Sequence, residues 1–359
     1  MTISDTVTGV AARESRRLLR WFRSHRRDLP WRRTRDPYRI WISEVMLQQT
    51  QVRTAIPYFE SFLERFPTVE ALAALPVERV LAAWSGLGYY RRARQLHQAA
   101  REIVSRGGFP QTARELEELP GIGAYTAAAV ASIAFDEGVP ALDGNVERVL
   151  SRYLALAGDP KRRPQRAALL AAGAALLDPE HPGEGNQSLM ELGATVCVPR
   201  RPRCGECPLA ESCRGRAAGD PGRYPPPRRR RPSERIVWSV AVVERNGKVL
   251  FFQRPETSGF LPGTWELPNV SRQGALEGLE QALADAYGGR WRLEEASFKV
   301  RHAVTYRSLT LRVHRARYAA RSSAAGPPAA WIDPEERAEY GLSSMFEKVL
   351  ARRSDLGDS

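Results

Sequence analysis

The sequence predicts a multidomain protein in which an all-α domain is followed by an α+β domain. Apolar residues recur at helical spacing from about Arg13 to Ala194, and with a period of two residues beyond position 235. A chain of 359 residues has room for about two domains. A segment rich in glycine, proline and arginine separates the two patterns, so we expect a helical domain over 1–213, a linker over 214–234 and an α+β domain over 235–352.

Helices are expected in the first domain over 77–104 and 163–177, where proline and glycine mark the breaks. In the second domain the alternating segments predict strands, and two amphipathic segments predict helices. The expected strands are 235–245, 247–254, 291–300 and 308–320, and the expected helices are 274–288 and 343–353.

The composition favours a polyanionic partner. The net charge is +13, and Lys161, Lys248, Lys299 and Lys348 are the only lysines, so arginine supplies nearly all the positive charge. Nucleic acid is the first candidate for such a surface, although codon bias also enriches arginine. We find no signal peptide or membrane-spanning run in the sequence and expect a soluble intracellular protein.

The stretch ELPGIGAYTAAAV, Glu118–Val130, contains a glycine-rich turn before an alanine-rich helix. Gly121 and Gly123 leave backbone N–H groups uncovered at the helix N-terminus, where the free donors and the helix dipole favour an anion such as a DNA phosphate. The preceding residues are also helical, which predicts helix, turn, helix. A dinucleotide fingerprint would need a preceding strand and a third glycine. A tight turn without a ligand is the alternative.

The cysteines are confined to one short segment, in the pattern C-x6-C-x2-C-x5-C formed by Cys197, Cys204, Cys207 and Cys213. Four thiolates so close in sequence suit a [4Fe–4S] cluster, which takes one cysteine per iron. A zinc site is the competing interpretation, but it usually shows two short C-x2-C pairs. The arginines in the first loop, Arg200, Arg201 and Arg203, suggest that the cluster stiffens a basic surface facing DNA.

Glu44 is predicted to occupy an apolar helix face, with Ile40, Trp41 and Leu47 at positions i−4, i−3 and i+3. Loss of water there disfavours the charged carboxylate and raises its pKa, so Glu44 is a candidate general acid. The alternative is a structural glutamate paired with an arginine or a backbone donor.

Asp143 precedes a predicted helix over 145–156 and is a natural N-cap, where backbone N–H groups favour its ionised form. A purely structural cap is the alternative. One neutral and one ionised carboxyl group would suit cleavage of a glycosidic bond, in which an acid protonates the leaving group and an anion faces the cationic sugar.

These stretches together resemble the iron–sulfur branch of the helix-hairpin-helix DNA glycosylases, and in particular its MutY-type adenine glycosylases. The resemblance is carried by WISEVMLQQTQV, WSGLGYYRRARQLH, LPGIGAYTA, LDGNVERVLSR, NQSLMELGATVC and the cysteine array. It implies a monomeric, nucleoid-associated cytoplasmic enzyme of base excision repair. The implied substrate is double-stranded DNA in which adenine faces 8-oxoguanine or guanine, with the adenine flipped out of the helix.

The resemblance also implies roles for individual residues. Glu44 would protonate adenine N7, and Asp143 would stabilise or capture the sugar cation, assisted by Tyr125 and Asn145. The residues implied to fill the base stack, contact the opposite base or line the adenine pocket are Gln49, Thr50, Tyr89 and Arg32. Core packing is the alternative for Tyr89.

The related endonuclease III enzymes carry a strand-cleaving lysine where Tyr125 stands, so the resemblance implies a monofunctional glycosylase. The alternatives left open are a bifunctional enzyme of the endonuclease III type, a glycosylase acting on T:G mismatches, and a DNA-binding module without catalysis.

Residues 235–352 resemble the Nudix-like domain that inspects 8-oxoguanine in this family. The segment 274–288 lacks the glutamate array that a Nudix hydrolase needs for Mg²⁺, so we expect binding without hydrolysis. Family members commonly carry Phe-Ser-His in the lesion-recognition loop, where this chain has Val304, Thr305 and Tyr306. The alternative is a strand pair with Val304 in the core.

Overall fold

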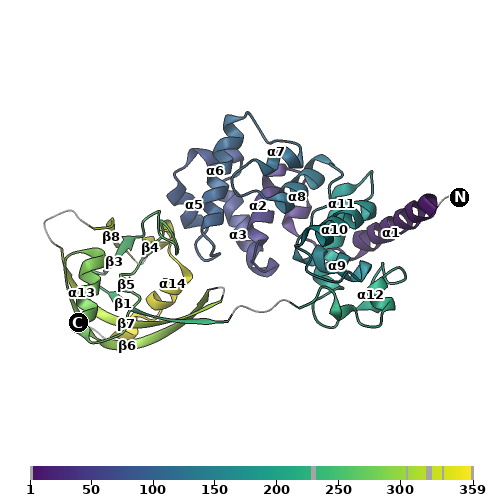
Figure 1. The fold of residues 1–359 in the computed structure, drawn as a ribbon. Coiled ribbons are helices and arrows are strands. Elements are labelled where there is room, and N and C mark those ends of the chain that lie inside the picture. Colours follow the sequence, from purple (N-terminus) through teal and green to yellow (C-terminus); the bar gives the residue numbers. More distant parts are fainter. Residues whose placement is uncertain (1–2, 228–231, 305, 321–325, 334, 357–359) are drawn as a thin grey trace. The chain divides into compact units, whose positions relative to one another are not determined.

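The computed structural model describes residues 3–227, 232–304, 306–320, 326–333 and 335–356 (Figure 1). Contacts between Cα atoms divide the chain into two compact units. The first, here called the helical unit, spans 1–71 and 98–229. The second, here called the mixed unit, spans 72–97 and 230–359. The segment 72–97 was expected in the N-terminal domain, and its contacts group it with the C-terminal part of the chain.

The helical unit is built from amphipathic helices, as the apolar spacing predicts. Helix α11 packs against α1, α8 and α9, while α2 packs against α3 and α8. These contacts bring the first turns of α8 and α9 close to α2. The helices that lie wholly in this unit are α1 (Ile3–His25), α2 (Pro37–Leu47), α3 (Val52–Arg65), α7 (Ala113–Glu117), α8 (Ala124–Phe135), α9 (Gly144–Leu154), α10 (Arg163–Leu176), α11 (Pro182–Thr195) and α12 (Arg214–Ala217). Helices α4 (Val69–Ala74) and α6 (Arg91–Ser105) continue from one unit into the other.

Helix α2 carries Glu44 and is terminated clearly at both ends. Asp36 caps its start by accepting a hydrogen bond from the Tyr38 N–H at 2.9 Å, and Pro37 occupies the first turn. The chain then turns sharply at Gln49, whose φ of 59° lies in the left-handed region. Because α2 is buried on almost every side, its one carboxyl group is held deep in the unit.

The predicted helix, turn, helix at residues 113–135 is present. Thr112 and Glu115 form a capping box at the start of α7, and Gly121 takes a φ of 75° in the turn. Gly123 is the N-cap of α8 and supplies no side-chain cap, so the first N–H groups of α8 are left for another partner. Glycine also permits a close approach of α11 to α9, since a Cβ atom at Gly193 would lie 2.7 Å from the Asn145 Cβ.

Part of the predicted linker is ordered structure on the helical unit. Residues 214–217 form α12 and residues 221–223 form a 3₁₀ turn, and both pack on α9. The Arg152 side chain donates to the Tyr224 carbonyl at 3.1 Å, which ties this segment down. A glycine at position 215 is needed there, because a Cβ atom would lie 2.5 Å from the Arg152 carbonyl oxygen. The predicted domain boundaries, with the linker over 214–234, remain a prediction.

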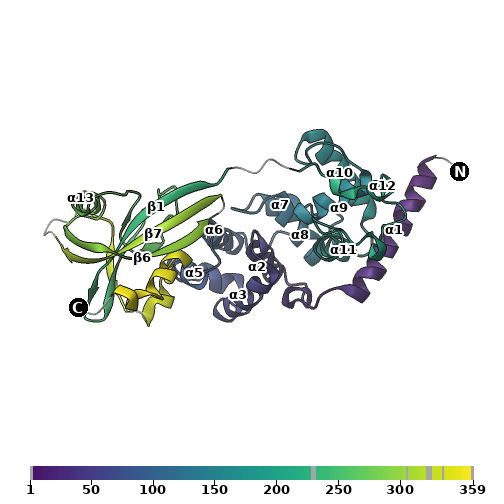
Figure 2. The ribbon, with the colours of Figure 1, turned by 90° about the horizontal axis from the view of Figure 1, so that it is seen from below.

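The α+β part of the mixed unit contains two sheets. Strands β1, β7 and β6 of the first lie side by side in Figure 2. In the first the strand order is β5-β1-β7-β6, with β1 parallel to β7 and the other pairs antiparallel. In the second, β3 pairs with β2, β4 and β8. The strands are β1 (Glu234–Val242), β2 (Glu244–Arg245), β3 (Lys248–Gln253), β4 (Trp265–Glu266), β5 (Asn269–Val270), β6 (Arg290–Val304), β7 (Arg307–Ala319) and β8 (Ala329–Ile332).

Alternate residues of the central strands enter two different cores. In β1, Val240 packs with the α14 side of the sheet while Ala241 packs with the α13 side. Strands covered on both faces show continuous apolar runs, which explains the sequences of β1 and β3. Helices α13 (Leu276–Tyr287) and α14 (Ser344–Leu350) lie where the sequence predicts them (Figure 1). No helix in the described part of the chain has the length and apolar content needed to span a membrane.

Candidate active site

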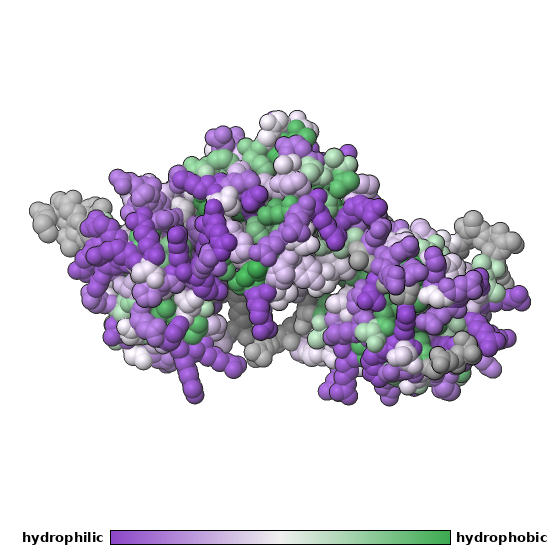
Figure 3. Space-filling view, turned by 180° about the vertical axis from the view of Figure 1, so that it is seen from behind, coloured by the Kyte–Doolittle hydropathy of each residue, from purple (hydrophilic) through white to green (hydrophobic). Residues whose placement is uncertain are grey.

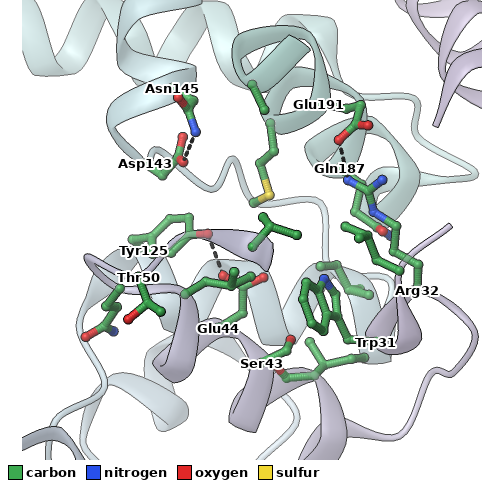
Figure 4. Close-up of a pocket in the computed structure, with 18 of the residues that line it drawn as sticks. Trp31, Arg32, Ser43, Glu44, Thr50, Tyr125, Asp143, Asn145, Gln187 and Glu191 are labelled. Carbon is green, nitrogen blue, oxygen red and sulfur yellow. Dashed lines mark hydrogen bonds and ion pairs between the residues drawn. The ribbon is translucent and has the colours of Figure 1, made fainter. Parts of the chain in front are cut away.

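A cavity of about 540 Å³ lies in the helical unit, where α2, α8, α9 and α11 meet (Figure 4). Its wall combines apolar side chains with three carboxyl groups, those of Glu44, Asp143 and Glu191. The sequence-predicted residues that line it are Arg32, Glu44, Gln49, Thr50, Tyr125, Asp143 and Asn145. Residues far apart in the sequence therefore share one site, which the sequence alone did not establish.

Glu44 is 6% exposed, and the Tyr125 hydroxyl donates to its Oε2 at 2.5 Å. Burial raises the pKa of Glu44 to about 7, and the charge of Asp143 acts in the same direction, whereas the Tyr125 donor and Arg32 oppose the rise. Burial also raises the pKa of Tyr125, which keeps this phenol a hydrogen-bond donor. The structure therefore supports the expected partly neutral acid at position 44.

Asp143 is the N-cap of α9, as predicted, and its Oδ1 accepts from the Val146 N–H at 2.7 Å. The expected preference for the ionised form is opposed by burial, which raises the pKa of Asp143 above its usual value. The N–H donors of Val146 and Asn145 act in the other direction. The environments of the two carboxyl groups thus differ less than the sequence suggested, since both are desolvated.

Asn145 links the Asp143 carboxylate to the segment that holds the cysteines. Its Nδ2 donates to Asp143 Oδ2 at 3.1 Å, and its Oδ1 accepts from Arg148 at 2.9 Å. Arg148 in turn donates to the carbonyls of Gly193 at 2.7 Å and Cys197 at 2.9 Å. The first turn of α9 is thereby fixed against the end of α11.

The far end of the cavity contains a buried glutamate, paired with two arginines, that was not predicted from the sequence (Figure 4). Glu191 is fully buried and accepts from Arg27 at 2.7 Å and from Arg32 at 2.8 Å. These arginines hold the pKa of Glu191 at about 2, against the effect of burial. Gln187, Met190, Glu191 and Ala194 all line the cavity at spacings of three and four residues, so a helical-face analysis of α11 would have found them.

The candidate DNA-contacting residues belong to both units. Gln49 and Thr50 lie at the cavity, and Gly121 and Gly123 lie at the start of α8, where Gly123 is exposed. Tyr89 belongs to the mixed unit, where it is 39% exposed with a φ of 53°. One face of the molecule, shown in Figure 3, is dominated by hydrophilic side chains, in keeping with the high charge.

The four cysteines line one small cavity, and each is a half-buried free thiol. In the described residues no three acidic, histidine or cysteine side chains converge as they would on a single metal ion. A [4Fe–4S] cluster takes one cysteine per iron, so four cysteines around one cavity fit such a cluster. Buried Arg152 donates to the Cys197 sulfur at 3.3 Å and to the Val198 carbonyl at 2.8 Å, so a fixed positive charge faces the thiolate ligands.

The candidate lesion loop connects β6 and β7. Val304 ends β6, pairs with Arg307 and packs against the core on the α14 side, which matches the strand-pair alternative for this residue. The Arg307 guanidinium lies 5.2 Å from the Tyr306 ring, and the Tyr306 carbonyl accepts from the Glu234 N–H. Thr305 lies outside the described residues.

Comparison with known families agrees with this architecture. Residues 42–172 match the HhH-GPD superfamily of base excision DNA repair proteins, 197–213 match the iron–sulfur binding domain of endonuclease III, and 239–352 match the NUDIX domain. A solved structure of a thermostable thymine-DNA glycosylase is 28% identical, with a TM-score of 0.54, and covers 60% of this chain and 100% of that one. The fold and the site define a base excision DNA glycosylase with a [4Fe–4S] cluster held by the four cysteines.

Curated relatives show which family of base excision DNA glycosylases this chain resembles. The adenine DNA glycosylase of Mus musculus is 36% identical, and the alignment covers 98% of this chain and 79% of the relative. That of Mycolicibacterium smegmatis is 47% identical over 57% of this chain and 70% of the relative. The chain belongs to the adenine DNA glycosylase family.

Proposed function

We propose that this protein removes adenine from A:8-oxoguanine and A:G mispairs by hydrolysing the N-glycosidic bond, and that it leaves an abasic site. The observation that carries the proposal is the meeting of Glu44, Tyr125 and Asp143 in one desolvated cavity. Such a cavity accepts a base only after the nucleotide has been flipped out of the helix.

Glu44 is the proposed general acid. With a pKa of about 7, roughly half of the Glu44 side chains carry the proton at neutral pH. Transfer of that proton to adenine N7 turns the base into a neutral leaving group, and the bond to the sugar then breaks. The Tyr125 hydroxyl orients the carboxyl group and accommodates its negative charge once the proton has left.

Asp143 is the proposed partner of the sugar cation. Its carboxylate is held by the α9 N–H groups and by Asn145, so it can face developing positive charge without moving. Burial makes that anion costly in the free protein, and a cation at the sugar C1′ would relieve the cost. Water then adds its oxygen at C1′ and releases a proton, which completes the hydrolysis.

The remaining candidates are proposed to hold the substrate. Arg32, fixed by Glu191, borders the base pocket, and Gln49 and Thr50 lie at the cavity wall where the opposite strand would need support. The uncapped N-terminus of α8 at Gly121 and Gly123 suits a phosphate. Tyr89 is proposed to act as a wedge that replaces lost base stacking.

A monofunctional reaction is proposed because no lysine lines the described cavity. Lys161 lies in an exposed turn before α10, and position 125 is occupied by tyrosine. A Schiff base with the sugar needs an amine nucleophile, which the cavity does not supply.

The α+β part of the mixed unit is proposed to recognise the base opposite adenine, through a surface that includes Val304, Thr305 and Tyr306. The segment 274–288 lacks the glutamate array that a Nudix hydrolase needs for Mg²⁺, which supports binding without hydrolysis. We also propose that the protein acts as a monomer on nucleoid DNA.

The test is base release from three matched duplexes carrying A:8-oxoguanine, A:G and T:G, each assayed with and without alkali. Release of adenine from the first two, and strand breaks only after alkali, would support the proposal. Thymine release is the second candidate, because the thymine-DNA glycosylase structure matches 60% of this chain and all of its own. Release of thymine without adenine would overturn the proposed substrate.

A further inference from the structure

The segment that carries Tyr89 is integrated into the mixed unit. It contains α5 (Val77–Ala83), a turn over Ser85–Tyr90, here called the wedge turn, and the first residues of α6. This segment and residues 230–359 form one compact unit, although more than 130 residues separate them in the sequence. The inference below rests on the proposed role of Tyr89 as a wedge.

The wedge turn presents Tyr89 outward in a constrained backbone. Gly86, Gly88 and Tyr89 have φ values of 94°, 70° and 53°, all in the left-handed region. A tyrosine in this region is strained, so its surroundings must hold it there. Trp84 is fully buried and donates its indole N–H to the Gly88 carbonyl at 3.1 Å, which closes the turn from inside.

Arg92 supports the Tyr89 ring from the first turn of α6. Its guanidinium lies 5.4 Å from the Tyr89 ring and 5.3 Å from the Trp84 ring. It also donates to the Gly88 carbonyl at 3.2 Å. Cation–π contacts on both rings fix the tyrosine side chain relative to the buried tryptophan.

One hydroxyl group on each side of Tyr89 in the sequence donates a hydrogen bond to the same carbonyl oxygen of the α+β part. Ser85 Oγ donates to the Leu342 carbonyl oxygen at 2.7 Å, and the Tyr90 hydroxyl donates to the same oxygen. Leu342 is fully buried in the core on the α14 side, and its backbone bridges to Trp265 of β4. The acceptor is therefore immobilised by the core of the Nudix-like fold.

Further contacts extend this attachment along the segment. Arg94 forms an ion pair with Glu256 at 2.7 Å and donates to the Pro262 carbonyl at 3.3 Å, both in the loop between β3 and β4. Arg79 pairs with Glu339 at 2.9 Å. The latter pair is exposed and contributes little, whereas the two hydroxyl groups on Leu342 lie at the base of the turn.

We propose that the Nudix-like fold positions the Tyr89 wedge through the Leu342 carbonyl, with Ser85 and Tyr90 as positioning residues. Inspection of the opposite base and insertion of the wedge are then coupled, because one rigid core supports both. Loss of the two hydroxyl groups frees the turn without altering the chemistry at Glu44, so the defect lies in forming the flipped complex.

The test compares single-turnover adenine release from A:8-oxoguanine duplexes by the full chain and its variants. Ser85→Ala combined with Tyr90→Phe removes two hydrogen bonds at nearly constant volume and is expected to slow release about tenfold. In a Tyr89→Ala background the same pair should change the rate less than about twofold, because the wedge is already absent. Ser239→Ala is the matched control, since it removes a serine donor to the Arg272 carbonyl elsewhere in the unit.

A second readout is independent of catalysis. In a Glu44→Gln background, a 2-aminopurine next to 8-oxoguanine should brighten on binding as the stack opens, and the Ser85→Ala, Tyr90→Phe pair should reduce that signal. Undiminished brightening, or a further tenfold loss of rate in the Tyr89→Ala background, would overturn the coupling. If Tyr89→Ala releases adenine as fast as the wild type, Tyr89 is not a wedge, and the proposed coupling fails with it.

Absence of adenine release by the wild type would instead refute the proposed function, while the fluorescence signal would still decide the coupling. If the melting temperature of the double variant is well below that of the wild type, the single variants Ser85→Ala and Tyr90→Phe replace it in the same comparison. Each is expected to slow adenine release about threefold.

Discussion

Tyr125 donates a hydrogen bond of 2.5 Å to Glu44 across the interface of α8 and α2. The phenol opposes the effect of burial on the Glu44 pKa, which otherwise rises further. The hydrogen bond thereby keeps the pKa of Glu44 close to neutral pH, where a general acid is most effective.

Replacing Glu44 with glutamine should reduce adenine release at least about 10²-fold, because the side chain can no longer supply a proton. Duplex affinity should change little. Single-turnover release and a binding titration check both expectations, with exposed Glu64→Gln on α3 as the matched control. Unchanged release would remove Glu44 from its role.

The same variant should be at least as stable as the wild type at pH 8. The folded-state pKa of Glu44, about 7, lies above its ordinary value of 4.5. The protonated side chain therefore contributes favourably to the free energy of unfolding below pH 4.5, and this contribution is lost as the pH rises through 7. Melting temperatures at pH 5 and pH 8 test this, and the difference between variant and wild type should grow toward pH 8.

The pH profile of kcat/KM should fall on its basic side near pH 7, where Glu44 loses its proton. Tyr125→Phe removes a donor that lowers the Glu44 pKa, so the basic side should move to higher pH even if the maximal rate drops. A shift to lower pH would contradict this account of the hydrogen bond.

Strand scission should require alkali, since the cavity presents tyrosine where a lyase needs an amine. Borohydride should trap no covalent complex with wild-type protein, whereas a parallel endonuclease III reaction provides the positive control. Borohydride trapping at the rate of base release would show a nucleophile that the described cavity does not contain.

Arg152→Gln should destabilise the cysteine segment. The buried guanidinium donates to the carbonyls of Cys197, Val198, Pro199 and Tyr224, and loss of several charged hydrogen bonds costs about 3 kcal/mol. The iron content of the purified protein and the urea concentration at its unfolding midpoint should both fall. Arg33→Gln is the control, because it removes only an exposed ion pair with Asp28, which contributes little to stability.

The local features of the site were predictable from the sequence because they depend on neighbours in the chain. Asp143 as the N-cap of α9, Glu44 on an apolar helix face and the glycine turn before α8 all follow from short-range spacing. The strand pattern of the C-terminal part was predictable for the same reason. Glu191 was missed because its partners, Arg27 and Arg32, are about 160 residues away.

Tertiary packing decided the rest. Burial of Asp143 offset the charge preference expected of an N-cap, since desolvation depends on which helices surround a group. The attachment of Ser85 and Tyr90 to Leu342 joins segments more than 250 residues apart, which no local pattern encodes. The sequence by itself determined which groups are acids, ligands and caps. Only the packed structure determined which of them meet and how much water they retain, because distance and desolvation arise from contacts that the chain order does not contain.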